Sequence, residues 1–252
     1  ITLQPQPAAR YQGTKQTFSV AAVGSVPFTY QWYFNPVSTS VTNAIAGATN
    51  STYTIADVET GNLGLYSVRV TNLRGITNSA AAALTLLPLD PNSYTAEVLF
   101  SGAASYWQFN EGSLTTAYDY ISGMNGTNVG GVILTNAGPT PSSFVGFANT
   151  NLAYTFNGTT AMVNLPSSFA LNPSAYSIVA WVRGDGVQAT NRVIIGQANG
   201  WCLRLDSGSY IALELVNGPK SGNFAGTAFV NNGDWHQVAA VFDGAREYLY
   251  VD

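Results

Sequence analysis

Side chains suited to nucleophilic or acid–base catalysis are scarce in this sequence. It contains one histidine, His236, and one cysteine, Cys202. A serine–histidine–aspartate triad would have to use His236, and no G-x-S-x-G motif presents a serine nucleophile. Cys202 lies between Trp201 and Leu203, without the basic neighbour that activates a thiolate. We therefore expect Cys202 to be a small buried side chain.

The carboxylates are also poorly placed for hydrolysis. Glycoside cleavage needs two carboxylates about 5–10 Å apart, but the 13 Asp and Glu residues stand mostly singly, in turns. Glu214 alternates with apolar neighbours and has no acidic residue two positions away, so we expect it to face solvent. The sequence predicts that this protein is not an enzyme.

Aromatic side chains are better candidates for binding. The chain has 14 Tyr and 5 Trp, and sugar recognition combines exposed rings with amides and hydroxyls. Tyr248 and Tyr250 are two positions apart, so they share one face of their strand. The predicted ligand-binding residues are Trp201, Tyr210, Tyr248 and Tyr250. The same rings could equally fill a sandwich core or cover its surface, and this alternative stays open.

Charge and hydropathy exclude several partners. The nine Lys and Arg are scattered and the net charge is −4, so the chain lacks the basic patch that nucleic acids and anionic lipids require. No apolar run approaches the ~20 residues that span a bilayer. Only 9% of residues are charged, and the Thr-, Asn- and Ser-rich surface is typical of secreted and cell-surface proteins. Such a surface also packs against further copies with little charge to desolvate.

Short strands and turns follow one another along the whole chain, which predicts an all-β fold. In the first part, strands are expected at 17–24, 27–35, 51–58, 65–72 and 78–87, the spacing of a β-sandwich. In the second part, a hairpin is expected around Asn157-Gly158. A strand is expected at 176–185, three more between 192 and 218, and a second hairpin at 231–252.

Residues 10–87 resemble a bacterial immunoglobulin-like domain. Trp32 matches the core tryptophan of that family, and Gly64-Leu65-Tyr66 matches its tyrosine corner. The two cysteines of the family would fall at Val20 and Val68, so the resemblance implies aliphatic packing in place of the disulfide. A single cysteine permits no internal disulfide in any case, which favours a bacterial exported protein. Residues 1–9 are expected to be an extended segment, and 88–103 a linker with a short helical turn.

Residues 104–252 resemble the laminin-G-like jelly roll, a concanavalin A-like sandwich. The resemblance rests on four ordered segments, which are the expected first strand at 105–113, then 154–166, 177–182 and 235–239. The family has a structural histidine where this chain has His236. The family also continues with further strands beyond the position of Asp252, so we expect missing sequence there. The first residues lack the basic and apolar regions of a signal peptide, so we expect either that a leader has been removed or that the chain is a piece of a longer one.

The same resemblance implies a calcium site. The loop at 119–126 is similar to a loop that helps to hold one Ca²⁺ in many laminin-G-like domains, and matching the positions gives Asp119 and Asn125 as ligands. Both offer the hard oxygens that calcium prefers. Tyr120 and Ile121 are bulky where the family has small polar residues. A turn without metal is the alternative.

The sequence thus predicts a non-catalytic binding or adhesion protein at a bacterial cell surface, with a glycan or a surface protein as partner. One alternative is a structural subunit of a surface layer or filament, in which a strand such as Ile1–Pro7 is donated to an open sandwich in the next copy. Another is a non-catalytic part of a larger secreted enzyme.

Overall fold

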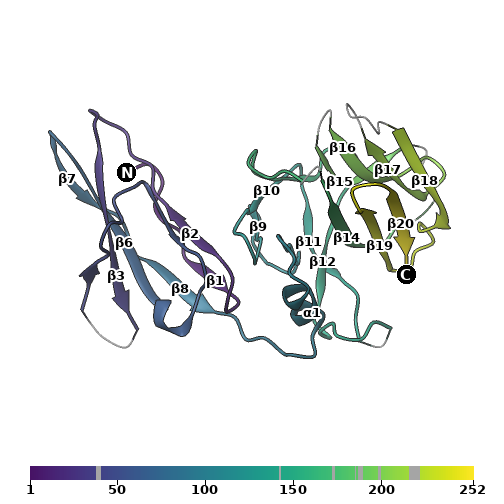
Figure 1. The fold of residues 1–252 in the computed structure, drawn as a ribbon, viewed down its shortest axis with the longest axis horizontal. Coiled ribbons are helices and arrows are strands. Elements are labelled where there is room, and N and C mark those ends of the chain that lie inside the picture. The colour runs from purple at the N-terminus through teal and green to yellow at the C-terminus, as the bar shows by residue number, and fades with distance from the viewer. Residues whose placement is uncertain are drawn as a thin grey trace. The chain divides into compact units, whose positions relative to one another are not determined.

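The computed structural model describes residues 1–37, 41–141, 143–171, 174–184, 186, 190–197, 200–215 and 222–252. Strands dominate these residues, which confirms the predicted all-β class. The chain forms two compact units, Ile1–Pro166 and Ser167–Asp252. In Figure 1 the first unit runs from purple to teal, and the second from green to yellow. The predicted linker at 88–103 lies inside the first unit.

The first unit begins with two sheets, and a strand overlaps each of the five predicted ranges. Several of these strands are shorter than predicted, and further short strands were not predicted. The larger sheet has the order β1 (Ala8–Arg10), β8 (Ala82–Leu86), β6 (Gly64–Asn72), β3 (Thr29–Pro36) and β4 (Asn43–Ala44), and β7 (Gly75–Asn78) also pairs with β6. The smaller sheet consists of β2 (Gln16–Ser19) and β5 (Thr52–Ile55). Alternate residues of β6 are buried, because successive side chains of a strand point to opposite faces.

Aromatic residues form the core of these two sheets. Trp32 and Tyr66 are 0% and 2% exposed, as predicted. The Tyr66 hydroxyl donates to the carbonyl oxygen of Asn62 at 2.6 Å, which is the hydrogen bond that defines a tyrosine corner. Val20 and Val68 belong to the same buried cluster, so aliphatic packing does occupy the two positions considered for a disulfide.

The rest of the first unit contains a helix and two small sheets. Helix α1 (Tyr94–Phe100) confirms the predicted helical turn, and the Ser93 hydroxyl accepts from the Ala96 amide at its N-cap. One sheet has the order β13 (Met162–Asn164), β10 (Gly126–Val129) and β9 (Thr116–Ala117), and the other pairs β11 (Ile133–Ala137) with β12 (Leu152–Thr155). The expected strand at 105–113 is reduced to an isolated bridge between Trp107 and Asp119.

The hairpin predicted around Asn157-Gly158 was wrong. Strands β12 and β13 flank these residues, but each pairs with a different sheet. The Asn157 side-chain oxygen instead accepts hydrogen bonds from the backbone amides of Thr159, Thr160 and Ala161. These bonds stabilise a wider loop that carries the chain from one sheet to the other.

The second unit is a sandwich of two sheets. Strands β14 (Tyr176–Val182), β19 (His236–Phe242) and β20 (Glu247–Val251) form one sheet. Strands β15 (Arg192–Gln197), β16 (Trp201–Leu205), β17 (Tyr210–Leu215) and β18 (Gly222–Phe229) form the other. Both sheets contribute to one core, which includes Ile178 and Val238 from the first and Leu203 and Leu213 from the second.

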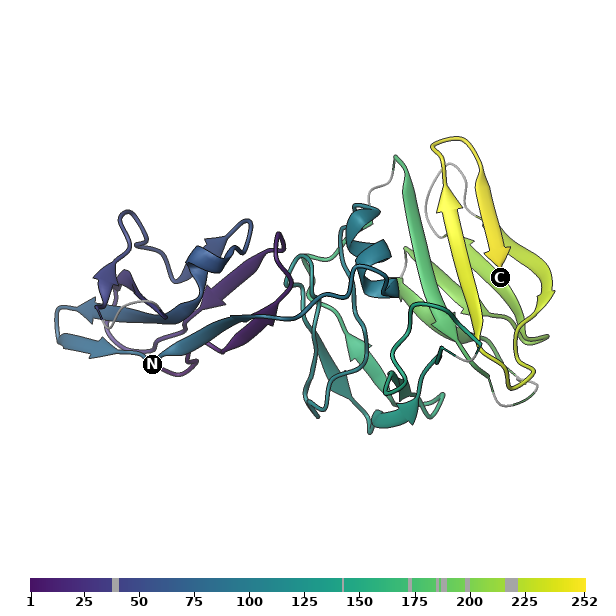
Figure 2. The same cartoon turned by 90° about the horizontal axis from the view of Figure 1, so that it is seen from below.

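The C-terminal hairpin has the predicted position and register. Strands β19 and β20 pair antiparallel, from Phe242 opposite Glu247 to Val238 opposite Val251, and Figure 2 shows the pair in yellow. The three strands predicted between 192 and 218 are β15, β16 and β17. Of the turn predicted between the first two, residues 198 and 199 lie outside the described part of the chain. No described helix has the length and apolar character needed to cross a membrane.

Candidate functional site

Two of the predicted binding residues form an exposed aromatic pair on β20. Tyr248 and Tyr250 are 37% and 54% exposed. Their ring centroids are 6.3 Å apart with an angle of 23° between the planes. Leu249 and Val251 alternate with them and pack against the sandwich core. The pair therefore lies on the outer face of its sheet, as period-two spacing predicted.

Small and apolar residues of the neighbouring strands continue this outer face. Tyr250 lies opposite Ala239 of β19, and Ala239 lies opposite Val179 of β14. Val179 is 52% exposed. Cross-strand partners share a face of the sheet, so the two rings stand beside a low strip of small side chains. At one end of the pair, the Tyr248 hydroxyl donates to Oδ2 of Asp243 at 3.3 Å. We call Tyr248, Tyr250, Val179 and Ala239 the tyrosine face.

The other two predicted residues lie elsewhere. Tyr210 is on β17 of the second sheet, where its ring packs edge-on against Phe229 at 6.1 Å. Trp201 is only 9% exposed and belongs to the core cluster between the sheets. The structure thus joins Tyr248 with Tyr250 and separates both from Tyr210 and Trp201.

A polar cluster on β16, β17 and β18 was not predicted. Arg204 donates from Nε to Glu214 at 3.2 Å and from Nη2 to Asn223 at 3.1 Å. The Arg204 side chain is 6% exposed and that of Glu214 is 42% exposed, so Glu214 faces solvent as expected but is paired. The Cys202 thiol lies 3.8 Å from the same carboxylate. Burial, and then the Glu214 charge, raise the pKa of this thiol. The cluster joins three strands through side-chain contacts that a residue-by-residue pattern does not reveal.

His236 is engaged at both ring nitrogens. Nδ1 lies 2.6 Å from Oδ2 of Asp252, and Nε2 lies 3.0 Å from Oδ1 of Asn232. A general base needs a ring nitrogen directed at the proton that it removes. These contacts instead tie the start of β19 to the preceding turn and to the end of β20, in keeping with the structural role that was expected.

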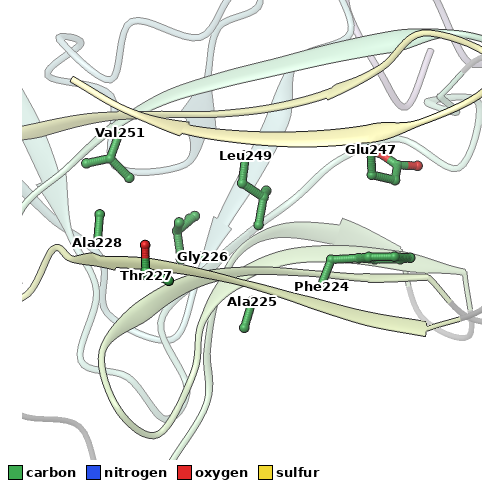
Figure 3. A pocket seen from close by; sticks show the side chains of 9 residues that line it. Phe224, Ala225, Gly226, Thr227, Ala228, Glu247, Leu249 and Val251 are labelled. Atoms are coloured by element: carbon green, nitrogen blue, oxygen red, sulfur yellow. The ribbon is translucent and has the colours of Figure 1, made fainter.

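A groove opens between β18 and β20, the end strands of the two sheets within the described residues. Its volume is about 380 Å³. Figure 3 shows Leu249 and Val251 of β20 pointing toward β18, where Gly226 and Ala228 lie across from them. Glu247 provides a carboxylate at one end of this groove, whose other lining side chains are mostly apolar. The groove therefore lies at the seam between the two sheets of the sandwich.

The two predicted calcium ligands lie together in the first unit. Asp119 is 0% exposed, and its backbone amide donates to Oδ1 of Asn125 at 3.0 Å. The Asp119 carboxylate accepts hydrogen bonds from the amides of Tyr106, Ile121, Ser122 and Met124 and from the Ser122 hydroxyl.

The groups that surround the Asp119 carboxylate do not fit the coordination of a calcium ion. Calcium requires about six to eight oxygen ligands, whereas the neighbours of the Asp119 carboxylate direct hydrogens at it. No group of three or more His, Cys, Asp or Glu side chains gathers anywhere in the described part of the chain. The geometry is that of a carboxylate that closes its own loop, and calcium binding stays a prediction.

A second buried carboxyl in the first unit was not predicted. Glu111 is 8% exposed and accepts from the Tyr118 amide and the Tyr154 hydroxyl, both at 3.3 Å. Burial raises the pKa of Glu111 above its ordinary value, although these hydrogen bonds oppose the shift. The same environment raises the pKa of Tyr154 to about 12.

Two comparisons with known proteins bear on these residues. A search of curated proteins returned no match to the chain. A family model does match its C-terminal part, which includes the tyrosine face, the polar cluster and the groove. Residues 157–252 match the laminin-G type of the concanavalin A-like lectin/glucanases superfamily.

Proposed function

We propose that the second unit binds a glycan outside the cell, without catalysis, and that the tyrosine face is its contact surface. The observation that carries the proposal is the exposed pair of Tyr248 and Tyr250 rings, 6.3 Å apart on one strand. The family match supports it, because the matched superfamily is described by its lectins as well as its glucanases.

The physical basis is the fit between a pyranose ring and an aromatic surface. The C–H groups on one side of a sugar pack against a ring face, while its hydroxyls need polar partners at the edge. Val179 and Ala239 lie beside the two rings on the same face, and their short side chains leave the ring faces standing above them. Asp243, which holds the Tyr248 hydroxyl, places a carboxylate at the edge of the face.

We propose binding without catalysis because the carboxylates near the tyrosine face do not converge on a common point. Asp243 accepts from the Tyr248 hydroxyl, and Glu247 accepts from the Tyr176 hydroxyl at 3.2 Å. Glu247 also lines the groove beneath the sheet. Two carboxylates must converge on one bond to hydrolyse a glycoside, and this arrangement gives them different partners and surroundings.

Glycan-array screening of the intact chain, followed by calorimetry on the best ligand, tests the proposal. Tyr248→Ala and Tyr250→Ala should each weaken binding about tenfold, since stacking of this kind contributes on the order of 1–1.5 kcal/mol. Tyr210→Ala is the matched control, because Tyr210 is also 37% exposed but lies on the other sheet. Unchanged affinity in both β20 variants, or loss only in the Tyr210 variant, would contradict the assignment of the tyrosine face.

The groove favours a second candidate, a self-assembling structural subunit. Among the described residues, β18 and β20 each have one hydrogen-bonded neighbour strand, so each has an edge at which another strand can add. The proposed occupant is the segment Ile1–Pro7 of a second copy, whose Ile1 and Leu3 share a face by period-two spacing. Here that segment pairs with its own unit, where Leu3 bridges Ala21.

Light scattering of the intact chain over a range of concentrations tests this candidate. Strand exchange predicts regular assemblies that disappear in Leu3→Asp, because the introduced charge would face the apolar side chains of Leu249 and Val251. Val23→Asp is the control, since Val23 is 75% exposed on the first unit. A monomer at every concentration, or assemblies that persist in Leu3→Asp, would exclude strand donation by this segment.

A further inference from the structure

The segment Arg10–Lys15 of the first unit is firmly held by its own sandwich. Arg10 closes β1 and its carbonyl oxygen accepts from the Leu87 amide at 2.8 Å. The Thr14 hydroxyl donates to the Tyr11 carbonyl oxygen at 2.7 Å, and the Val58 amide donates to the Thr14 carbonyl oxygen at 2.9 Å. This segment therefore presents its side chains from a fixed backbone.

Residues of this segment contact the loop that contains Asp119. The Lys15 amide donates to the Ile121 carbonyl oxygen at 2.9 Å. The rings of Tyr11 and Tyr120 lie 5.7 Å apart at an angle of 57°. The Tyr11 hydroxyl accepts from Nε2 of Gln108 at 3.0 Å. Tyr120 and Ile121 are thus the residues that depart from the family loop and also the residues that touch Arg10–Lys15.

The Arg10 guanidinium is buried beside this loop. Arg10 is 3% exposed, and its Nη2 atom lies 3.8 Å from the position that a Cβ on Gly123 would occupy. Burial lowers the pKa of Arg10, and the nearby Asp119 charge opposes that shift. A buried cation needs an anion near it. Among the described residues no direct ion pair reaches Arg10, and Asp119 is the carboxylate whose charge acts on it most strongly.

We propose that the Asp119 loop is a receptor for the Arg10 side chain, and that the guanidinium supplies the positive charge expected from calcium. The loop then needs no metal ion to hold the two sheets that carry Arg10–Lys15 against the segment that follows α1. This inference is independent of the proposed glycan binding, because it concerns residues of the first unit alone.

Hydrogen exchange of the Lys15 amide in the intact chain reports directly on this contact, because that amide donates to Ile121. Arg10→Met should reduce its protection about tenfold or more, since it removes the buried positive charge beside the Asp119 loop. Tyr120→Ser should act in the same direction from the opposite side, and Tyr120→Phe should retain protection. Arg74→Met, at an exposed position, is the matched control.

Two other amides separate loss of docking from loss of folding. The Val58 amide bonds within the first sandwich and the Asp119 amide bonds within its own loop, so both should keep their protection in Arg10→Met. Equal loss at all three amides would overturn the proposal, as would full Lys15 protection in Arg10→Met. Calorimetric titration of the wild-type chain with calcium chloride should show no binding, and one bound calcium that requires Asp119 would also overturn it.

Discussion

The backbone amide of Asp119 donates to the side-chain oxygen of Asn125 at 3.0 Å. The two residues matched to calcium ligands are therefore partners of one another. The Asp119 carboxylate in turn accepts hydrogen bonds from the loop that separates it from Asn125, including those from Ile121 and Met124. The Asp119 carboxylate therefore stabilises its own loop by accepting hydrogen bonds from the backbone amides of that loop, as an Asx turn does.

These hydrogen bonds predict that the conservative substitution Asp119→Asn strongly destabilises the first unit. In Asp119→Asn one carboxylate oxygen becomes an NH₂ group that faces other donors, so the free energy of unfolding of the first unit should fall by about 1–3 kcal/mol or more. Urea denaturation with and without a calcium chelator measures it. Asp57→Asn, at an exposed position, should have little effect. A chelator that destabilises the wild type as much as Asp119→Asn does would instead favour a bound ion.

The hydrogen bond from Tyr66 to the Asn62 carbonyl predicts a smaller and more local effect. Tyr66→Phe keeps the ring in the core but leaves the partly buried carbonyl of Asn62 without its donor, which should cost about 1 kcal/mol. The same denaturation experiment on the first unit measures this cost. An unchanged midpoint would mean that the hydroxyl adds nothing to stability. Tyr33→Phe is a suitable comparison, because Tyr33 lies on the neighbouring strand β3, where its ring packs under Arg69.

Local patterns predicted the strands well where each strand pairs with its sequence neighbour. The hairpin of β19 and β20 is such a case, because its turn and alternation act over a few residues. Asn157-Gly158 gave an equally strong turn signal, yet β12 and β13 pair with other strands. Sheet partners are chosen by contacts between residues distant in sequence, which a turn motif does not encode.

The candidate site was predictable only in part for the same reason. Period-two spacing placed Tyr248 and Tyr250 on one face, but it could not say that Trp201 would face the core while Tyr210 faced outward on another sheet. Arg204 gave no signal of its own, because its partners Glu214 and Asn223 come from two other strands. Burial of a charged side chain is decided by such partners.

The contact between Cys202 and Glu214 predicts that the Cys202 thiol reacts slowly with alkylating reagents. Burial and the neighbouring carboxylate raise the pKa of Cys202, so less thiolate exists near neutral pH than in a free cysteine. Alkylation by iodoacetamide, followed by mass spectrometry, should be slower than in the urea-unfolded chain. Glu214→Gln should accelerate it, because the negative charge is removed. A folded rate equal to the unfolded rate would contradict the prediction.

Glu111 predicts a dependence of stability on pH in the first unit. Its folded pKa is raised above the ordinary value of 4.5 because burial disfavours the charged form. Between 4.5 and the raised pKa, the folded state therefore binds more protons than the unfolded state. Linkage then requires that the stability from Glu111 be fully present below 4.5 and be lost as the pH rises through the folded pKa.

Comparison with Glu111→Gln isolates this contribution from the other carboxylates. The amide introduced by this substitution cannot ionise, so the free energy of unfolding of the wild type relative to the variant should decline from pH 4.5 upward and then level off above the raised pKa. Urea denaturation at a series of pH values measures the difference. Glu97→Gln, at an exposed position on α1, should show no such decline. A difference that rises with pH would mean that the hydrogen bonds from Tyr118 and Tyr154 outweigh burial and hold Glu111 ionised.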